Sequence, residues 1–289
     1  MEETRNKRML ELWTPGRGTL LPGAGNALAA RIMESVGFEA VLFTGAGFAN
    51  SYLGVPDMGL SSVKEVVDQL AAMRDAIDIP ILADADTGFG NALNVRRTVR
   101  MMERAGANAI LLEDQVFPKR CGHFDNKQVI AKTEMVKKIQ AAVDARATGM
   151  LILARTDARA IEGIDGAIDR MRAYQEAGAD LLFIEAPVSV EELARIPKEL
   201  PGRHLCNMVY GGKTPIPSRE TLGGMGYAVI AYANAALQAS MLAMQHVMKH
   251  LKDHGSLEGV ESAVIGFEDR QKFVDYPRYC ELEKRYTGA

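Results

Sequence analysis

A short stretch near the middle of the chain carries residue types that are unusual at the end of a buried strand. An apolar run from Ala109 to Leu112 ends in two acids, Glu113 and Asp114. The loop that follows holds four ionisable side chains, Lys119, Arg120, Cys121 and His123. Acids of this kind can hold a metal ion, and a thiol on a loop can act as a proton donor. We therefore interpret the stretch as part of an active site rather than as a charged surface loop.

The same pattern, an apolar run followed by polar or small residues, recurs along the chain. The groups at these run ends are Thr44, Gly45 and Ala46, then Asp84 and Asp86, Glu113, Arg155, Glu185 and Asn207. The small residues would let backbone N–H groups approach an anion. Carboxylates gathered at one place would repel one another without a cation, and oxygen ligands without histidine pairs favour Mg²⁺. The planar guanidinium of Arg155 suits a substrate carboxylate.

Cys121 differs from the other two cysteines in its surroundings. A lone cysteine is usually a small buried apolar residue, and this is our interpretation of Cys206 and Cys280. The cations next to Cys121 in the sequence are expected to lower the pKa of its thiol. The glycine that follows, Gly122, is expected to let the loop move.

The elements that must position these groups alternate between short apolar strands and amphipathic helices. Strands are expected at 19–22, 40–44, 79–84, 109–113, 151–155, 180–185, 204–208 and 227–232. Helices are expected between them at 27–36, 62–76, 92–105, 132–147, 164–177 and 190–199. This alternation predicts an α/β fold, a parallel (β/α)8 TIM barrel with its site at the C-terminal ends of the strands. A doubly wound open sheet is the alternative, which the lack of a Gly-x-Gly-x-x-Gly turn after the first strand disfavours.

No composition shift or flexible linker divides the chain, so we expect residues 1–289 to form a single domain. Residues 235–289 are expected to be a C-terminal helical region. It starts with a helix at 235–251 and continues as a charged tail at 258–288, which is also predicted to be helical. The tail is not needed to complete a barrel of eight strands and eight helices, and we therefore expect it to pack on a neighbouring subunit.

The composition excludes several classes of protein. The chain has 289 residues, of which 47% are hydrophobic and 25% charged, and its net charge of -3 comes without a basic run. Nucleic acid and anionic membranes are therefore not expected partners. No apolar stretch is long enough to span a bilayer, and the N-terminal residues lack the apolar core of a secretory signal. Three cysteines at unrelated spacings indicate a reducing, cytoplasmic setting.

Taken together, the motifs resemble the isocitrate lyase/phosphoenolpyruvate mutase superfamily over nearly the whole chain. The segments that carry the resemblance are 54–59 (Gly-Val-Pro-Asp-Met-Gly), 84–90 (Asp-Ala-Asp-Thr-Gly-Phe-Gly), 113–123, 154–158 (Ala-Arg-Thr-Asp-Ala) and 207–215 (Asn-Met-Val-Tyr-Gly-Gly-Lys-Thr-Pro). Within the superfamily, the Lys-Arg-Cys-Gly-His sequence at 119–123 is typical of the carbon–carbon lyase branch. Phosphoenolpyruvate mutases proper have asparagine in place of this cysteine.

The resemblance implies a barrel whose last helix is exchanged between neighbours, a homotetramer, and a requirement for Mg²⁺ with Mn²⁺ as a substitute. It implies three groups of site residues. Asp84 and Asp86, helped by Asp57 and Glu113, would hold the metal. The backbone of residues 44–46, with Arg155, would bind a pyruvate-like carboxylate, and Glu185 and Asn207 would complete the pocket. Cys121 would protonate the departing enolate, on a loop that also brings Lys119 and His123. The residues do not identify the base, for which Glu113 is a candidate.

Two segments bear on the substrate. The sequence at 207–215 is closer to dimethylmalate lyases, plant petal death proteins and carboxyphosphonoenolpyruvate mutases than to methylisocitrate lyases. Alignment on Tyr232 places Gln238 where methylisocitrate lyases carry an arginine for the third carboxylate of their substrate. A neutral amide there favours a small 2-hydroxy dicarboxylate, above all 2,3-dimethylmalate, cleaved to pyruvate and propionate. Tyr210 and the pair Ala233 and Asn234 depart from the usual residues near the pocket.

Three other kinds of enzyme have much the same motifs and remain alternatives. They are methylisocitrate lyase, oxaloacetate hydrolase or decarboxylase, and phosphonomutase of the carboxyphosphonoenolpyruvate type. A barrel kept only as a binding protein is disfavoured, because the acids and the thiol of the site are all present.

Overall fold

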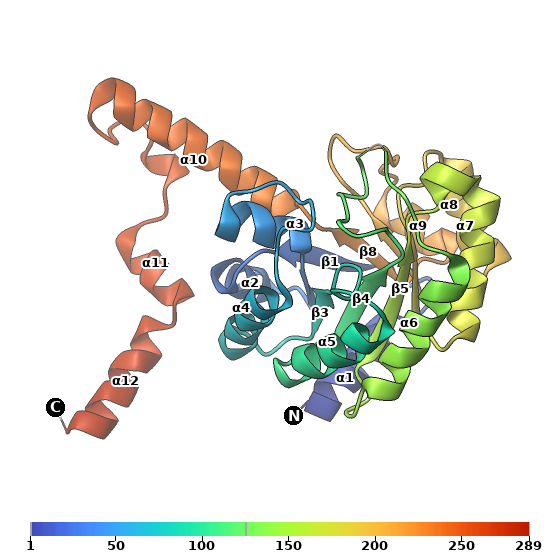
Figure 1. The fold of residues 1–289 in the computed structure, drawn as a ribbon. Coiled ribbons are helices and arrows are strands. Elements are labelled where there is room, and N and C mark those ends of the chain that lie inside the picture. The colour runs from blue at the N-terminus through green and yellow to red at the C-terminus, as the bar shows by residue number, and fades with distance from the viewer. Residues whose placement is uncertain (1, 125, 289) are drawn as a thin grey trace.

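Eight parallel strands close into a barrel in the order of the sequence (Figure 1). The computed structural model describes residues 2–124 and 126–288. The strands are β1 (Thr19–Ala24), β2 (Val41–Phe43), β3 (Ile81–Asp84), β4 (Ala109–Glu113), β5 (Leu151–Thr156), β6 (Leu181–Ile184), β7 (His204–Asn207) and β8 (Val229–Tyr232). β8 pairs with β1 in parallel, with Thr19 opposite Val229, and this pairing closes the barrel. The predicted TIM barrel is confirmed.

Helices surround the barrel and connect its strands. They are α2 (Ala27–Ser35), α3 (Gly45–Phe48), α4 (Val63–Ala76), α5 (Ala92–Arg104), α6 (Lys132–Ala145), α7 (Arg159–Glu176), α8 (Val190–Glu199) and α9 (Arg219–Met225). Local capping explains several starts. At α4, for example, Ser62 and Glu65 cap each other's backbone N–H groups. The sequence analysis did not predict α3 or α9, and α7 begins before the expected residue 164, with a break at Gly163 where φ is 75°.

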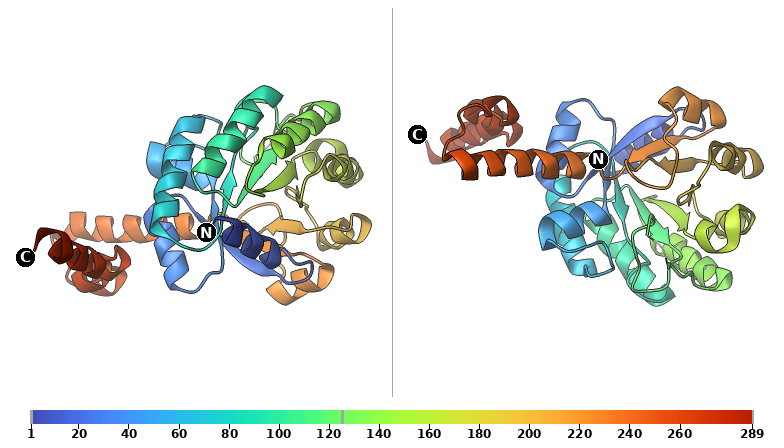
Figure 2. Two further views of the ribbon diagram at one scale, coloured as in Figure 1. Left: turned by 90° about the horizontal axis from the view of Figure 1, so that it is seen from below. Right: turned by 90° about the horizontal axis from the view of Figure 1, so that it is seen from above.

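An N-terminal helix, α1 (Glu2–Leu12), which was not predicted either, lies at the N-terminal end of the strands (Figure 2). Its residues Met9 and Leu12, with Trp13, are buried in one cluster with the leucines that fill the barrel. Asn6 accepts a hydrogen bond of 2.8 Å from Asn108, which precedes β4. The helix therefore closes the bottom of the barrel and leaves the opposite end for chemistry.

The C-terminal region forms an arm that projects from the barrel (Figures 1 and 2). It consists of α10 (Ala235–His254), a 3-10 turn (Glu261–Ala263), α11 (Phe267–Phe273) and α12 (Tyr276–Thr287). The C-terminal helix is confirmed, and the predicted helical tail is divided into three short helical segments with non-helical residues between them. Large apolar side chains are exposed along one face of α10, at Met241, Met244, Met248 and Leu251.

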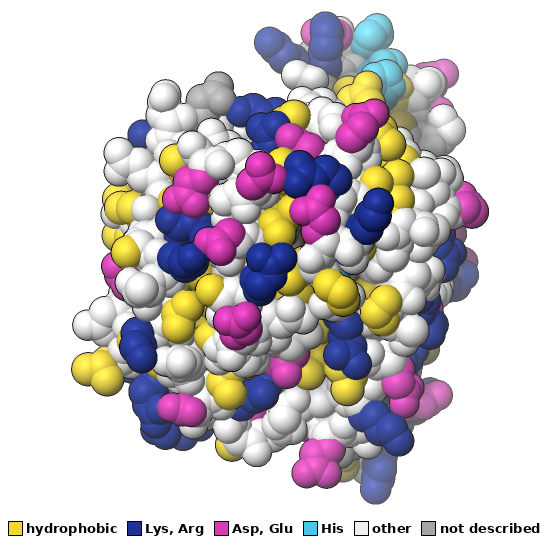
Figure 3. Space-filling model, turned by 90° about the vertical axis from the view of Figure 1, so that its right-hand side faces the viewer, with side chains coloured by type: hydrophobic (Ala, Val, Ile, Leu, Met, Phe, Trp, Pro, Cys, Tyr) yellow, Lys and Arg dark blue, Asp and Glu magenta, His cyan; other side chains and the backbone are white. Residues whose placement is uncertain are grey.

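Two observations bear on the expected partners. No helix in the described part of the chain is long and apolar enough to cross a membrane. On the face shown in Figure 3, Lys and Arg side chains alternate with Asp and Glu side chains rather than forming a patch of one sign. This face therefore offers no stripe for a nucleic acid backbone.

Candidate active site

The polar groups at the strand ends face one narrow cavity at the C-terminal mouth of the barrel. The cavity has a volume of about 50 Å³. The expected site residues that line it are Thr44, Ala46, Asp57, Asp84, Cys121, His123, Arg155, Glu185 and Asn207. Apolar side chains from the strands form its floor, among them Leu111 and Phe183. The structure thus brings together groups that are more than 160 positions apart in the sequence.

Acidic side chains on one side of the mouth surround a lysine. The ammonium of Lys119 lies 2.5 Å from Asp57 Oδ1 and 2.9 Å from Asp86 Oδ1. Burial raises the pKa of Asp86 to about 6, although Lys119 acts in the opposite direction. Asp84 accepts hydrogen bonds from the backbone N–H groups of Asp86 (3.0 Å) and Gly45 (3.2 Å). These four residues, here called the acidic cluster, come from the end of β3 (Asp84), the turn after it (Asp86) and two further loops (Asp57 and Lys119).

Arg155 is surrounded by carboxylates of the protein. Its Nε and Nη2 atoms lie 2.9 and 3.1 Å from the two carboxylate oxygens of Asp157. Nη2 is also 3.2 Å from Glu185 Oε2, and Nη1 is 3.4 Å from Glu113 Oε2. Burial strongly raises the pKa of Glu113, against the effect of Arg155. These contacts fix the plane of the guanidinium at the cavity wall before any substrate arrives.

Cys121 is held on a loop that folds over the cavity, here called the cysteine loop (residues 117–124, 126 and 127). Burial raises the pKa of its thiol, and the nearby carboxylates of Asp57 and Glu185 act in the same direction. The expected lowering of this pKa by neighbouring cations is therefore wrong. The ammonium of Lys119 points to the acidic cluster, and the side chain of Arg120 is exposed. A thiol that keeps its proton at neutral pH is suited to act as an acid.

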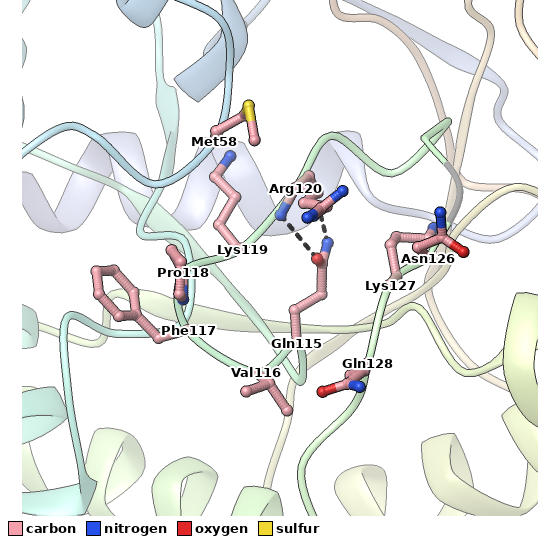
Figure 4. Close-up of a pocket in the computed structure, with 10 residues that line it drawn as sticks. All are labelled: Met58, Gln115, Val116, Phe117, Pro118, Lys119, Arg120, Asn126, Lys127 and Gln128. Atoms are coloured by element: carbon pink, nitrogen blue, oxygen red, sulfur yellow. Dashed lines mark hydrogen bonds between the residues drawn. The ribbon is translucent and has the colours of Figure 1, made fainter.

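His123 and Gln115 support the cysteine loop from two sides. His123 Nδ1 accepts a hydrogen bond of 3.1 Å from the backbone N–H of Lys213, and its Nε2 atom is 3.6 Å from Glu185 Oε1. Burial lowers the pKa of His123, which favours the neutral ring. The amide of Gln115 bonds to both the N–H and the carbonyl of Arg120 (Figure 4). A second cavity, of about 330 Å³, lies on this side of the loop.

Some expected site residues lie away from the cavity wall. Among the described residues, Gly45, Asp86, Glu113 and Lys119 do not line it, although each contacts a residue of the site, as given above. Gln238 is exposed on α10 and donates a hydrogen bond of 3.3 Å to the carbonyl of Tyr210. Tyr210 itself is 83% exposed. Both side chains are therefore outside the cavity.

Sequence reasoning assigned no role to three residues that the structure places in or beside the site. Asn234 lines the cavity, and its buried Oδ1 atom has no hydrogen-bond partner. Asp157 binds Arg155 and also Lys127, whose ammonium is 2.7 Å from its carboxylate. Asp157 belongs to the Ala-Arg-Thr-Asp-Ala segment and could have been found there. Nothing in the sequence singled out Lys127, because an isolated lysine in a loop is normally solvated.

The donor atoms near the acidic cluster fit a hard divalent cation. Among the described side chains, no three His, Cys, Asp or Glu groups are gathered closely enough to form a complete metal cage. Yet Glu113 Oε1 is buried without a hydrogen-bond partner, and Asp86 Oδ1 is paired with the ammonium of Lys119. Buried carboxylate oxygens rarely stay unpaired, and Mg²⁺ typically binds through one or two carboxylates together with water. The residues present therefore fit the ion.

The sequence matches the model of the phosphoenolpyruvate phosphomutase family over residues 9–252. The chain belongs to the phosphoenolpyruvate mutase/isocitrate lyase superfamily. It is 43% identical over 281 residues to the 2,3-dimethylmalate lyase of Eubacterium barkeri, with 97% of each chain covered. It is 42% identical to a chloroplastic carboxyvinyl-carboxyphosphonate phosphorylmutase of Arabidopsis thaliana (93% of this chain and 81% of that one). It is 40% identical to a 2-methylisocitrate lyase of Aeropyrum pernix (91% and 84%).

Solved structures give the same family. A 2,3-dimethylmalate lyase aligns with a TM-score of 0.91 at 31% identity, covering 99% of this chain and 95% of that one. An oxaloacetate acetylhydrolase with the inhibitor 3,3-difluorooxalacetate aligns at 0.92 and 29% identity, covering 99% and 98%. A phosphonopyruvate hydrolase in complex with oxalate and Mg²⁺ aligns at 0.87 and 29% identity, covering 98% and 99%. The protein is thus an enzyme, a carbon–carbon lyase of the oxo-acid-lyase type that resembles 2,3-dimethylmalate lyase.

Proposed function

We propose that this enzyme cleaves a small 2-hydroxy dicarboxylate between C2 and C3 in a Mg²⁺-dependent reaction, with 2,3-dimethylmalate as its substrate and pyruvate and propionate as its products. The observation that carries the proposal is that Cys121, whose thiol has a raised pKa, lines the same small cavity as Arg155. The similarity to 2,3-dimethylmalate lyase over 97% of the chain supports the choice of substrate.

The composition of the cavity wall favours a dicarboxylate over a tricarboxylate. Arg155 is the one arginine or lysine among the described residues that line the cavity, and protein carboxylates already engage most of its N–H groups. The remaining polar wall includes two neutral amides, Asn207 and Asn234. A third substrate carboxylate would be desolvated there without a cation to pair with.

The residues have separate roles in this reaction. Asp84 and Asp86, with Asp57 and Glu113, would hold Mg²⁺, which when bound supplies a Lewis acid beside the developing negative charge. Arg155 and the backbone N–H groups of residues 44–46 would orient the carboxylate next to the hydroxyl group. Thr44 caps α3; its own N–H group bonds to the carbonyl of Ala24, and the N–H group of Gly45 bonds to Asp84. Glu185 and Asn207 would complete the substrate pocket.

Bond cleavage requires one proton to leave oxygen and another to reach carbon. A base takes the C2 hydroxyl proton, C2 becomes the keto carbon of pyruvate, and the electron pair of the C2–C3 bond moves into an enolate of propionate. Glu113 is our candidate for the base, because burial makes its carboxylate a better proton acceptor. Cys121 then gives its proton to C3, which yields propionate. Lys119 and His123 hold the cysteine loop to the acidic cluster and to Glu185.

We also propose that barrel and arm form a single domain in a homotetramer, in which the arm packs on a neighbouring subunit. The large apolar side chains on one face of α10 support this, because a face of this size is rarely left in water. Val247 is the one residue of this helix that is buried within the chain.

An assay of pyruvate release tests the substrate. Purified enzyme would be given 2,3-dimethylmalate, methylisocitrate, isocitrate and oxaloacetate, each with Mg²⁺, with Mn²⁺ or with EDTA. Cleavage of isocitrate, which gives no pyruvate, would be followed as glyoxylate. We expect the highest kcat/KM for dimethylmalate with Mg²⁺, lower activity with Mn²⁺ and none with EDTA. Oxaloacetate is the second candidate because of the structural match to oxaloacetate acetylhydrolase, and its cleavage is followed as acetate and oxalate. Preference for methylisocitrate would show that our choice of substrate is wrong.

A further inference from the structure

A buried lysine joins the cysteine loop to the mouth of the barrel. The ammonium of Lys127 lies 2.7 Å from Asp157 Oδ1 and also donates a hydrogen bond to the carbonyl of Gly122. Both charged side chains are nearly inaccessible, with exposed fractions of 2% and 0%. A long cationic side chain is rarely buried to this extent unless its partners fix it.

Asp157, one of the two partners of Lys127, is held firmly in place. Its carboxylate is held by the Nε and Nη2 atoms of Arg155, and its backbone N–H donates a hydrogen bond of 3.0 Å to Asp114. Asp114 is fixed in turn by Tyr174, whose hydroxyl donates to it at 2.8 Å. Burial opposes ionisation of Asp157, but Arg155 and Lys127 lower its pKa to about 2. The carboxylate of Asp157 therefore stays ionised beside the cavity.

Gly122 is the other partner of Lys127, and a larger side chain at this position would find almost no free space. A Cβ atom added there would lie 2.5 Å from Arg155 Nη2 and 2.5 Å from Glu185 Cγ. Its neighbours on both sides, Cys121 and His123, line the cavity. Fixing the carbonyl of Gly122 therefore fixes the backbone that carries the thiol.

We propose that Lys127 is a positioning residue that latches the cysteine loop over the cavity by joining the Gly122 carbonyl to Asp157. Lys127 does not line the cavity and acts on the reaction through the backbone next to Cys121. The inference rests on the proposed function only for its kinetic consequences. Without the latch, the loop spends more time open, and the thiol is less often in place for proton transfer.

Proteolysis measures loop opening without any assumption about the reaction. Phe124 is on the cysteine loop and is a chymotrypsin site, whereas Phe117 is followed by Pro118 and is not cut. Lys127→Met should be cut at Phe124 on the order of tenfold faster than the wild type, with Mg²⁺ and oxalate giving less protection than in the wild type. Lys132→Met is the matched control, because Lys132 makes an exposed ion pair with Asp169 shortly after the loop. The proposal is wrong if Lys127→Met and Lys132→Met are cut at the same rate.

A second variant approaches the latch from its other end, for the event that Lys127→Met does not fold. Gly122→Ala adds the Cβ atom that has no room between Arg155 and Glu185, and it changes no residue of the barrel. We expect faster cutting at Phe124 with an unchanged unfolding temperature. Protection equal to that of the wild type would contradict the proposed closure.

Kinetics separate positioning from a general loss of structure. For the substrate that the wild type cleaves, Lys127→Met should lower kcat on the order of tenfold or more, and Lys127→Arg should restore part of it by keeping the cation. An unchanged kcat in Lys127→Met would overturn the positioning role. If the wild type cleaves none of the acids in the panel, the proposed function fails, while the chymotrypsin comparison still decides whether the latch exists.

Discussion

The ammonium of Lys119 lies 2.9 Å from a carboxylate oxygen of Asp86, at the centre of the acidic cluster. The pKa of Lys119 is raised despite its burial, because Asp86 and the other acids around it stabilise its charge. A residue of the cysteine loop thus neutralises part of the proposed metal site. Closure of the loop and the charge of the site are therefore coupled, which connects the thiol on the loop to the acids on the barrel.

Asp84→Ala should abolish Mg²⁺-dependent pyruvate release, because it removes a proposed ligand and also the acceptor for the N–H groups of Gly45 and Asp86. Isothermal titration with Mg²⁺ checks binding apart from activity. Asp68→Ala is the control, since it removes an acid from an exposed ion pair on α4. Activity that survives both Asp84→Ala and EDTA would show that these acids do not hold a metal.

Cys121→Ser should fold normally and bind Mg²⁺ like the wild type but lose turnover by a hundredfold or more, on the order expected for a missing proton donor. A serine hydroxyl is a much weaker acid than a thiol. The matched control is Cys280→Ser on α12, outside the barrel mouth. Pyruvate release and the unfolding temperature are measured for both variants. Turnover near the wild-type rate in Cys121→Ser would remove the thiol from the mechanism.

His204 makes the folded protein sensitive to acid. It is fully buried at the start of β7, and burial lowers its pKa from 6.5 to about 4. The folded state therefore binds the proton less readily than the unfolded state. The stability from a neutral His204 is complete above pH 6.5 and is lost as the pH falls toward 4, by roughly 3 kcal/mol in total.

His204→Gln should weaken this dependence. Glutamine can still donate to the carbonyl of Leu200, which the imidazole contacts at 2.5 Å, but it takes up no proton. Between pH 7 and pH 5 the unfolding temperature should fall less in His204→Gln than in the wild type. His246→Gln on the exposed surface of α10 serves as the control and should follow the wild type. Parallel curves for all three proteins would contradict the assignment.

The barrel could be predicted from the sequence because each strand is a short apolar run with a helix pattern after it. The predicted β4, at 109–113, agrees with the structure at both ends. Where the predicted and the observed ends of a strand differ, contacts with other elements set the observed end. Residues 40 and 44, for example, were expected in β2 but lie just outside it, where Thr44 becomes the N-cap of α3. The helix α1 has no regular apolar stripe to reveal it, because its few buried side chains are set by the barrel bottom.

The sequence could predict which residues stand at the ends of the strands, but not the contacts that they make with one another. Arg155 was expected to face a substrate carboxylate, but spacing could not show that Asp157, Glu113 and Glu185 already surround it. Gln238 was placed by counting from Tyr232, whereas the direction of α10 leaves its side chain exposed. The pKa of Cys121 depends on burial by parts of the chain that are distant in sequence, so neighbouring cations were a poor guide.

The exposed apolar face of α10 allows a test of how the subunits pack. Met244 is 58% exposed on the apolar face of α10, and in the proposed tetramer this face is covered by a neighbouring subunit. Met244→Asp would place a charge in that contact and should shift the protein to smaller assemblies, because an unpaired charge is costly to bury. Gln245→Asp is the control: it adds the same charge at the next position, which lies on a different side of the helix. Light scattering after size-exclusion chromatography gives the mass of each variant. A tetramer that persists in Met244→Asp, or a wild type that is monomeric, would rule out packing of this face between subunits.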